Sequence, residues 1–188
     1  MSHGATAAAR AGILAGLAAC CAIPTMPPAS TPVIVVASLV LAVMTGWIVW
    51  QDASDFTIPD GPLLVIALLG VALRMSAAQG DWREALSILV DAGLCGGALL
   101  AIREAYYRLK GMDGLGFGDV KLAASGGSLL GITGFAHALL AASALGLAVV
   151  LMLMLIKPAR RIDRLPFGAL LAPACALVWA LSLVVAYR

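Results

Sequence analysis

Two aspartates stand at the edges of long apolar stretches, where a carboxyl group is unusual. Asp52 follows the apolar residues 33–50, and Asp119 ends the glycine-rich run 114–118 just before another apolar stretch. A charged carboxylate costs about 2.5–3.5 kcal/mol at the centre of a spanning helix and less near the interface, so such acids face a protein interior or a watery cavity. Two facing carboxyl groups cannot both ionise easily. The ionised member could activate water while the protonated member polarises a scissile carbonyl, which is the chemistry of an aspartic protease.

A structural interpretation explains the same residues. Asp is favoured near helix N-termini, and glycine-rich turns often join helices. Gly114, Gly116 and Gly118 lack Cβ atoms, so they could also let an extended substrate lie beside Asp119. Spacing alone leaves both interpretations open.

Composition places these acids in a membrane protein. Of the 188 residues, 62% are hydrophobic and only 12% are charged, whereas a soluble domain has about a quarter charged residues. A spanning helix needs about 20 apolar residues, so the length predicts an all-α polytopic integral membrane protein with six to seven transmembrane helices in a single domain, 1–188. The net charge of +2 and the lack of a basic run interleaved with aromatics argue against nucleic acid as a partner. The four cysteines show no CxxC spacing, which favours packing thiols over a disulfide or zinc framework.

Hydropathy and turn residues predict where the helices lie. The segment 24–32 contains several prolines and predicts a loop. The turn before the sixth helix is predicted at Thr133–Gly134. The seven predicted helices cover approximately residues 5–23, 33–50, 62–78, 82–107, 119–132, 135–156 and 167–187, of which the first is an additional N-terminal helix and the other six form a core over 33–186.

Basic residues predict the orientation, because cytoplasmic loops carry an excess of Lys and Arg. One basic cluster lies around the loop between the fourth and fifth helices, and another lies in the loop before the last helix. These loops are two spans apart, so they share a side, and counting back by pairs of spans places Asp52 and Asp119 on that side as well. We therefore expect both acids to lie at the cytoplasmic face. The residues in the two clusters are Arg103, Arg108 and Lys110, and Lys157, Arg160, Arg161 and Arg164.

Three motifs resemble those of the type IV prepilin peptidases, which are GxGD-type membrane aspartyl peptidases. Residues 52–60 (DASDFTIPD) resemble the first family motif, in which a catalytic Asp precedes an Ile/Leu-Pro-Asp/Asn turn. Residues 116–122 (GFGDVKL) resemble the second, GxGDxKL, and residues 165–168 (LPFG) resemble a Pro-Phe-Gly element near the family's C-terminus. GxGD alone is shared with presenilin-like and preflagellin peptidases, but its pairing with the upstream motif is specific.

The resemblance implies roles for individual residues. Asp52 and Asp119 become the catalytic pair, and Asp52 is chosen over Asp55 because it has the family's spacing to Pro59. Asp55 and Asp60 are then expected to be turn or capping residues. The resemblance also implies that no metal or cofactor takes part. The supporting or substrate-binding positions would be Gly116, Gly118, Lys121 and Pro59.

The resemblance further implies a substrate and a location. Family substrates are prepilins or pseudopilins with a basic leader, a Gly before the cut and an apolar helix after it. The expected location is the bacterial inner membrane, with the lipid bilayer around the enzyme and the active site facing the cytoplasm. Long family members carry a cytoplasmic region, often with CxxC pairs, that is linked to methylation of the new N-terminus. This chain has no CxxC motif, so we expect cleavage alone from this short form.

Charged residues also occur within the apolar stretches of the third and fourth predicted helices. Arg74 and Asp91 lie on neighbouring helices at similar depth, so we expect them to form an ion pair, since an unpaired charge there would be costly. The competing hypothesis for function is a small transporter or channel in which Asp52, Asp119 and Asp91 form an ion route.

Overall fold

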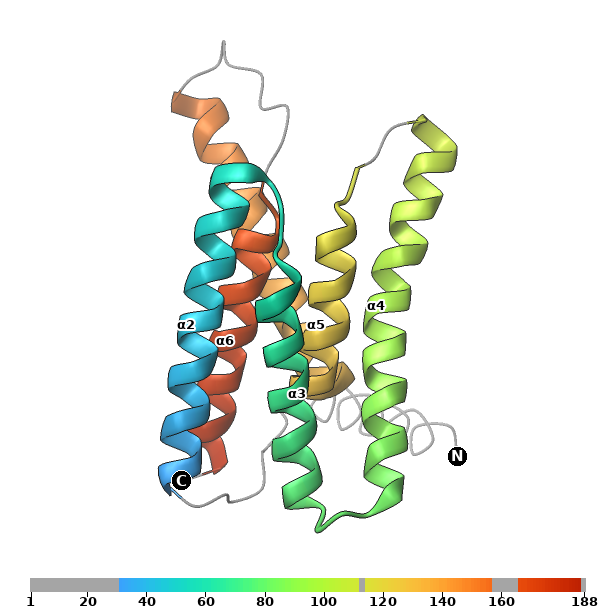
Figure 1. Ribbon diagram of the computed structural model, residues 1–188. Helices are drawn as coiled ribbons and strands as arrows, with labels where there is room; N and C mark the ends of the chain where they lie inside the picture. Colours follow the sequence, from blue (N-terminus) through green and yellow to red (C-terminus); the bar gives the residue numbers. More distant parts are fainter. Residues whose placement is uncertain (1–30, 112–113, 157–165, 187–188) are drawn as a thin grey trace, which may run out of the picture.

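The computed structural model describes residues 31–111, 114–156 and 166–186, which form five helices and no strand (Figure 1). Each helix is long and apolar enough to cross a bilayer. Large apolar side chains cover the outside of the bundle, as Leu68 (59% exposed) and Leu140 (70% exposed) illustrate. Such an exterior is that of a multi-pass membrane protein, whose helices satisfy their own backbone in lipid. The helices are α2 (Thr31–Asp55), α3 (Asp60–Ala77), α4 (Trp82–Lys110), α5 (Phe117–Ile156) and α6 (Gly168–Ala186).

The described helices differ from the prediction in number and in several boundaries. Five helices fill the described ranges, so the predicted six to seven are not confirmed. The two helices predicted over 119–132 and 135–156 belong to α5. Residues 51–55, predicted as part of a polar turn, instead form the last turn of α2. The predicted helix at 5–23, Cys20, Cys21 and the basic loop around 157–164 lie outside the described residues.

A glycine breaks α5 into two helical arms, but not at the predicted position. Gly131 has φ 69° and ψ 173°, a backbone conformation that is essentially restricted to glycine. The predicted turn at Thr133–Gly134 is therefore wrong, and Gly134 lies buried within the second arm. In Figure 1 the first arm descends beside α4, and after the break the second arm rises behind α6.

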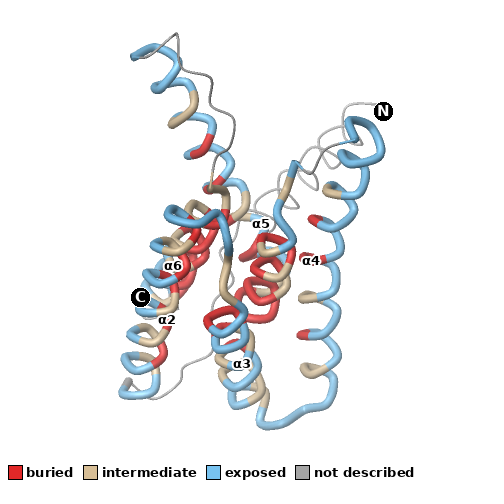
Figure 2. The backbone as a smooth tube through the Cα atoms, turned by 45° about the horizontal axis from the view of Figure 1, so that its top comes forward, coloured by how far each residue is buried: buried red, intermediate tan, exposed pale blue. Residues whose placement is uncertain are grey.

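The first arm of α5 is the centre of the bundle. Most residues between Asp119 and Leu130 are buried, and α3, α4 and α6 all pack against this helix. Figure 2 shows the buried residues gathered on this arm and on the faces of α2 and α6 that point inward. Because α2 packs on α6 and α3 rather than on α4, the arm holds the two sides of the bundle together.

Two glycines allow the outer helices to approach this arm closely. A Cβ atom on Gly70 of α3 would lie 2.6 Å from the backbone Cα of Leu129. A Cβ atom on Gly127 would lie 2.8 Å from the carbonyl oxygen of Asp91 on α4. Small residues at such crossings are a common basis for helix packing in membranes, where lipid offers as much apolar contact as protein.

This packing predicts the effect of enlarging Gly70. Gly70→Ala places a methyl group against helix backbone, which cannot move aside as a side chain can, so we expect the protein to be destabilised by about 1–3 kcal/mol. Gly97→Ala on α4 is the matched control, because nothing lies within 4 Å of its Cβ position. The measurement is the thermal unfolding midpoint in detergent. Equal midpoints for the two variants would contradict the close α3–α5 crossing.

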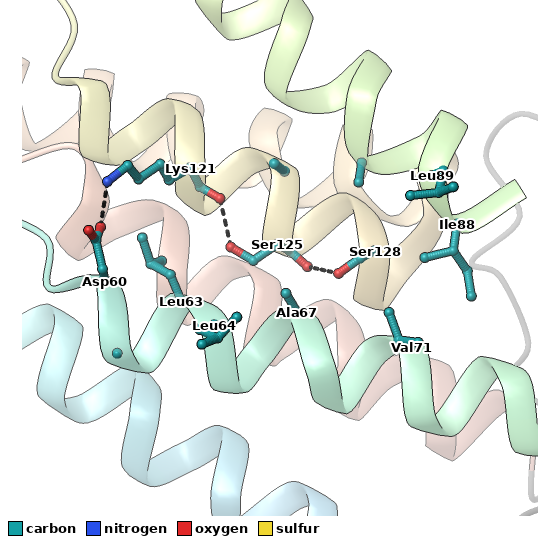
Figure 3. Close-up of a pocket in the computed structure, with 13 residues that line it drawn as sticks. Asp60, Leu63, Leu64, Ala67, Val71, Ile88, Leu89, Lys121, Ser125 and Ser128 are labelled. Atoms are coloured by element: carbon teal, nitrogen blue, oxygen red, sulfur yellow. Dashed lines mark hydrogen bonds and ion pairs between the residues drawn. The ribbon is translucent and has the colours of Figure 1, made fainter. Parts of the chain in front are cut away.

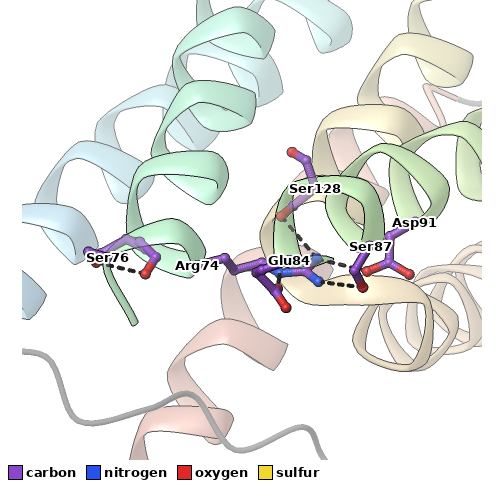
Figure 4. Close-up of polar contacts among 7 residues, drawn as sticks. Arg74, Ser76, Glu84, Ser87, Asp91 and Ser128 are labelled. Atoms are coloured by element: carbon purple, nitrogen blue, oxygen red, sulfur yellow. Dashed lines mark hydrogen bonds and ion pairs between the residues drawn. The ribbon is translucent and has the colours of Figure 1, made fainter. Parts of the chain in front are cut away.

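Charged side chains join α3 to α4 near the turn that connects these two helices (Figure 4). Arg74 Nε lies 2.7 Å from Glu84 Oε1, and Arg74 NH1 lies 2.8 Å from Asp91 Oδ2. The predicted Arg74–Asp91 pair is therefore confirmed, and Glu84 is an additional partner. Arg74 also donates to the carbonyl of Ser128 at 3.4 Å and to the hydroxyl of Ser87 at 3.3 Å, so it contacts α5 as well.

Removing the cation from this cluster should be costly. Arg74→Ala leaves two partly buried carboxylates without their partner, and we expect a loss of about 3–5 kcal/mol of stability. Arg108→Ala is the control, since its ion pair with Glu104 is exposed (76% and 49%) and exposed pairs contribute little. Thermal unfolding in detergent compares the two. If both variants unfold at the wild-type temperature, the cluster does not hold the hairpin.

Candidate active site

The first carboxyl group of the site lies in the last turn of α2. Asp52 is 5% exposed, whereas Asp55, three residues later at the end of the helix, is exposed. Phe56 follows with φ 53° and donates its N–H to the carbonyl of Asp52 at 3.1 Å. This left-handed residue turns the chain away from α2 and toward α3. Of these two acids, Asp52 is therefore the one whose carboxyl group is buried in the protein.

The second carboxyl group lies in the first turn of α5. Asp119 is 7% exposed, and its N–H donates to the carbonyl of Gly116 at 3.2 Å. The preceding glycine-rich segment is tied to α4, because Arg103 Nε donates to the carbonyl of Leu115 at 3.1 Å. The guanidinium of Arg103 also lies 5.9 Å from the centre of the Phe117 ring. These contacts fix where α5 begins and hence where Asp119 points.

The two carboxyl groups converge on the start of α6. A Cβ atom on Gly168 would lie 3.0 Å from Asp52 Oδ2 and 3.2 Å from Asp119 Oδ1. Because both oxygens are that close to one point, their separation cannot exceed the sum of these two distances. Ala169 N–H donates to Asp52 Oδ2 at 2.6 Å, so the N-terminus of α6 holds one carboxyl group in place. Asp119 Oδ1 is buried, and no described residue donates a hydrogen bond to it.

A pocket of about 280 Å³ opens beside the two acids. Its walls come from the α2–α3 loop and from the start of α5. Gly118 lies against Ile58, since a Cβ atom there would come within 2.9 Å of the Ile58 Cβ. Gly116 faces the pocket, and the contacts of a Cβ atom there would be Asp119 Oδ2 at 3.4 Å and the Gly118 N at 4.0 Å. The lining residues are Asp52, Phe56, Thr57, Ile58, Asp60, Gly116, Phe117, Gly118, Asp119 and Lys121.

An ion pair forms one side of this pocket. Lys121 Nζ lies 2.6 Å from Asp60 Oδ1, and the two side chains are 41% and 74% exposed. Lys121 also lies 5.4 Å from the centre of the Phe117 ring. Asp60 begins α3 and was expected only as a turn or capping residue, so its partnership with Lys121 is new information from the structure.

The structure thus brings together most of the predicted site residues. Asp52 and Asp119 face one point, and Gly116, Gly118 and Lys121 line the pocket beside them. Pro59 does not line the pocket; it occupies the N-cap position of α3 with extended backbone. Asp91 lies elsewhere, in the cluster with Arg74. Within the described ranges, no three His, Cys, Asp or Glu side chains are grouped so that they could hold a metal ion.

Comparison with known protein families decides the relationship. A family model described as the type IV leader peptidase family matches residues 39–151. The chain belongs to the type IV leader peptidase family. The match contains both Asp52 and Asp119 and ends before α6 begins. No curated protein and no solved structure matches the chain.

Three residues that contact the acids of this leader peptidase, or the glycines beside them, were not among the predicted site residues. Ile58 packs between Gly118 and Gly168, and Gly168 with Ala169 contacts the acids. The Pro-Phe-Gly element at 166–168 was the only sequence signal for α6 in the site, and it carried no implied role. Almost every residue has a backbone N–H, and the chain contains 20 glycines. The sequence therefore did not single out Gly168 or Ala169 as contacts of the acids.

The convergence at Gly168 predicts a coupling with Ile58. In Gly168→Ala the new methyl group would meet the Ile58 Cδ1, so we expect a lower thermal unfolding midpoint. Adding Ile58→Ala removes the obstructing atom and should restore part of the stability. A double-mutant cycle in detergent should give a coupling energy of about 0.5–3 kcal/mol, as found for residues in contact. Additive effects of the two substitutions would mean that the residues do not meet.

Proposed function

We propose that this leader peptidase is an aspartic endopeptidase that removes the basic leader from prepilins or pseudopilins. The observation that carries the proposal is the convergence of Asp52 Oδ2 and Asp119 Oδ1 on the Gly168 position beside a pocket. Two carboxyl groups that share a small space differ in protonation, because one charge disfavours a second. The pair therefore supplies one general base and one general acid.

The mechanism follows from this pair. The ionised carboxylate takes a proton from a water molecule, whose oxygen attacks the scissile carbonyl carbon. The protonated carboxyl group donates its proton to the carbonyl oxygen, giving a neutral tetrahedral diol. On collapse of the diol, the carboxyl group that received the water proton transfers it to the departing amine nitrogen, and the other carboxylate recovers a proton from a diol hydroxyl. The C–N bond breaks, leaving the leader with a free carboxyl group and the mature chain with a free amine.

Residues around the pair hold this geometry. The hydrogen bond from Ala169 N–H occupies Asp52 Oδ2 and fixes the orientation of that carboxyl group. Asp119 Oδ1 is buried and receives no hydrogen bond from a described residue, so no described donor competes with a substrate group for this oxygen. Lys121 forms its ion pair with Asp60 rather than with either of the two acids. The distribution of Lys and Arg supports placing the site at the cytoplasmic face of the inner membrane.

The competing ion-route hypothesis has less support. It needs Asp52, Asp119 and Asp91 to act along one path. Asp91 is 2.8 Å from the guanidinium of Arg74, on α4 near the turn that joins it to α3, whereas the other two acids meet at the start of α6. An acid held in a structural ion pair is not free to bind and release a moving ion, so Asp91 is poorly suited to an ion pathway.

Isosteric substitution of each acid tests the proposal. Asp52→Asn and Asp119→Asn keep the shape of the site but remove one proton-transfer group, so each should slow cleavage by at least about 10²–10⁴-fold. Asp55→Asn is the matched control, because this exposed acid lies on the same turn of α2 and should leave the rate unchanged. The measurement is release of the leader from a co-expressed prepilin, followed on a gel at equal enzyme levels. Normal cleavage by either dyad variant would refute the assignment.

A further inference from the structure

A second hollow runs along the bundle, from Asp60 and Lys121 at one end toward Val71 at the other (Figure 3). It has a volume of about 610 Å³ and lies between α3, α4 and the first arm of α5. It shares Asp60 and Lys121 with the active-site pocket, so the two hollows meet at this ion pair. We refer to the larger hollow as the lateral groove.

The lateral groove follows the bundle for several helical turns. On α3 its lining runs from Asp60 to Val71, and these residues are eleven positions apart. At 1.5 Å per residue this corresponds to about 16 Å, or roughly three turns of a second helix laid alongside. Ser128 lines the far end, and its carbonyl accepts from Arg74, so the groove ends beside the Arg74 cluster.

The surface of the lateral groove is apolar between these two ends. Leu64 and Leu89 form exposed walls (61% and 69% exposed). The serines on α5 expose no unpaired hydroxyl to the groove: Ser125 Oγ donates to the carbonyl of Lys121, and Ser128 Oγ donates to that of Ser125, both at 2.7 Å. Asp60 and Lys121, at one end, are the charged residues in the lining. An occupant that complements this surface is uncharged and has its own backbone hydrogen bonds satisfied.

Small residues make room for the backbone of such an occupant. Ala67 of α3, Ala92 of α4 and Ala124 of α5 all line the groove. Small side chains at a helix interface let two backbones approach closely, which is a main source of helix association in lipid. A helix in the groove would make close van der Waals contacts along its whole length. A lipid tail in the groove would make contacts no better than those it makes elsewhere in the bilayer.

We propose that the lateral groove binds the apolar helix that follows the scissile bond of the substrate. This inference rests on the proposed function, because a bond held at Asp52 and Asp119 continues on one side into a chain that must enter the membrane. The groove begins where the active-site pocket ends and extends about three helical turns away from it. The groove therefore recognises a membrane-inserted helix, and the ion pair between Asp60 and Lys121 marks the point where that helix begins.

Site-specific photo-cross-linking tests the occupant directly. Benzoylphenylalanine is placed at Ala67 or Ala92 in the groove, or at the exposed Ala72 or Ala98 on other faces of the same helices. The probe is a tagged polypeptide with a basic leader, a Gly before the cut and an apolar helix after it, and Asp119→Asn enzyme prevents its cleavage. We expect cross-links to the probe at the two groove positions, several-fold above the two controls. Equal yields at all four positions, or cross-links from the groove to lipid alone, would overturn the proposal.

Filling the groove gives an independent functional test. Ala67→Leu and Ala92→Leu should slow cleavage of the membrane-inserted probe several-fold, while Ala72→Leu and Ala98→Leu should not. None of the four should slow cleavage of a short soluble peptide that ends a few residues after the scissile bond. If the groove variants lose activity on both substrates alike, the groove does not act as a separate helix site. If wild-type enzyme cleaves neither substrate, the proposed function fails, and the cross-linking result still decides whether the groove holds a helix.

Discussion

The placement of both acids depends on how tightly the first arm of α5 is packed. This arm carries Asp119 at its start, and almost every residue down to Leu130 is buried against α3, α4 or α6. In lipid, tight packing of this kind replaces the hydrophobic effect as the force that joins helices. Gly70 and Gly127 set the approach of α3 and α4, and Gly168 sets the approach of α6 to the acids. A Cβ atom at Gly70 or Gly127 would meet the backbone of a neighbouring helix, and one at Gly168 would meet the Ile58 side chain and both carboxyl groups.

The bundle handles charge differently at its two ends. Near the α3–α4 turn, Arg74 meets two carboxylates and two further polar groups, so opposite charges compensate each other. At the start of α6, two carboxyl groups converge, and one of them, that of Asp52, accepts a hydrogen bond from the backbone N–H of Ala169. The first arrangement is stable because charges are paired. Under the proposed function, the second keeps a charge and a proton available for catalysis, whereas the paired charges of the first do not.

Sequence reasoning predicted the residues whose burial is costly, because few interpretations accommodate them. An intramembrane acid or arginine needs a partner or a site, and that requirement led to Asp52, Asp119 and the Arg74–Asp91 pair. It did not predict which glycine breaks α5. The segment contains Gly126, Gly127, Gly131 and Gly134, and tertiary packing buries three of them while Gly131 takes the positive φ. Nor did it predict the Asp60–Lys121 pair, since residues 61 positions apart show no local pattern.

A small enzyme has little surface with which to recognise a substrate sequence. The proposed groove offers another way to select which peptide bond is cleaved. A helix seated between α3 and α4 can slide along the groove only until its polar beginning reaches Asp60 and Lys121, where the apolar lining ends. The peptide bond just before that helix then lies in the adjoining pocket, beside Asp52 and Asp119. Holding the bond there makes the attack effectively unimolecular, which is a large part of what positioning contributes to catalysis. On this view, selectivity comes from where the apolar helix begins, and the residues of the leader matter chiefly through their charge and their fit at the cut.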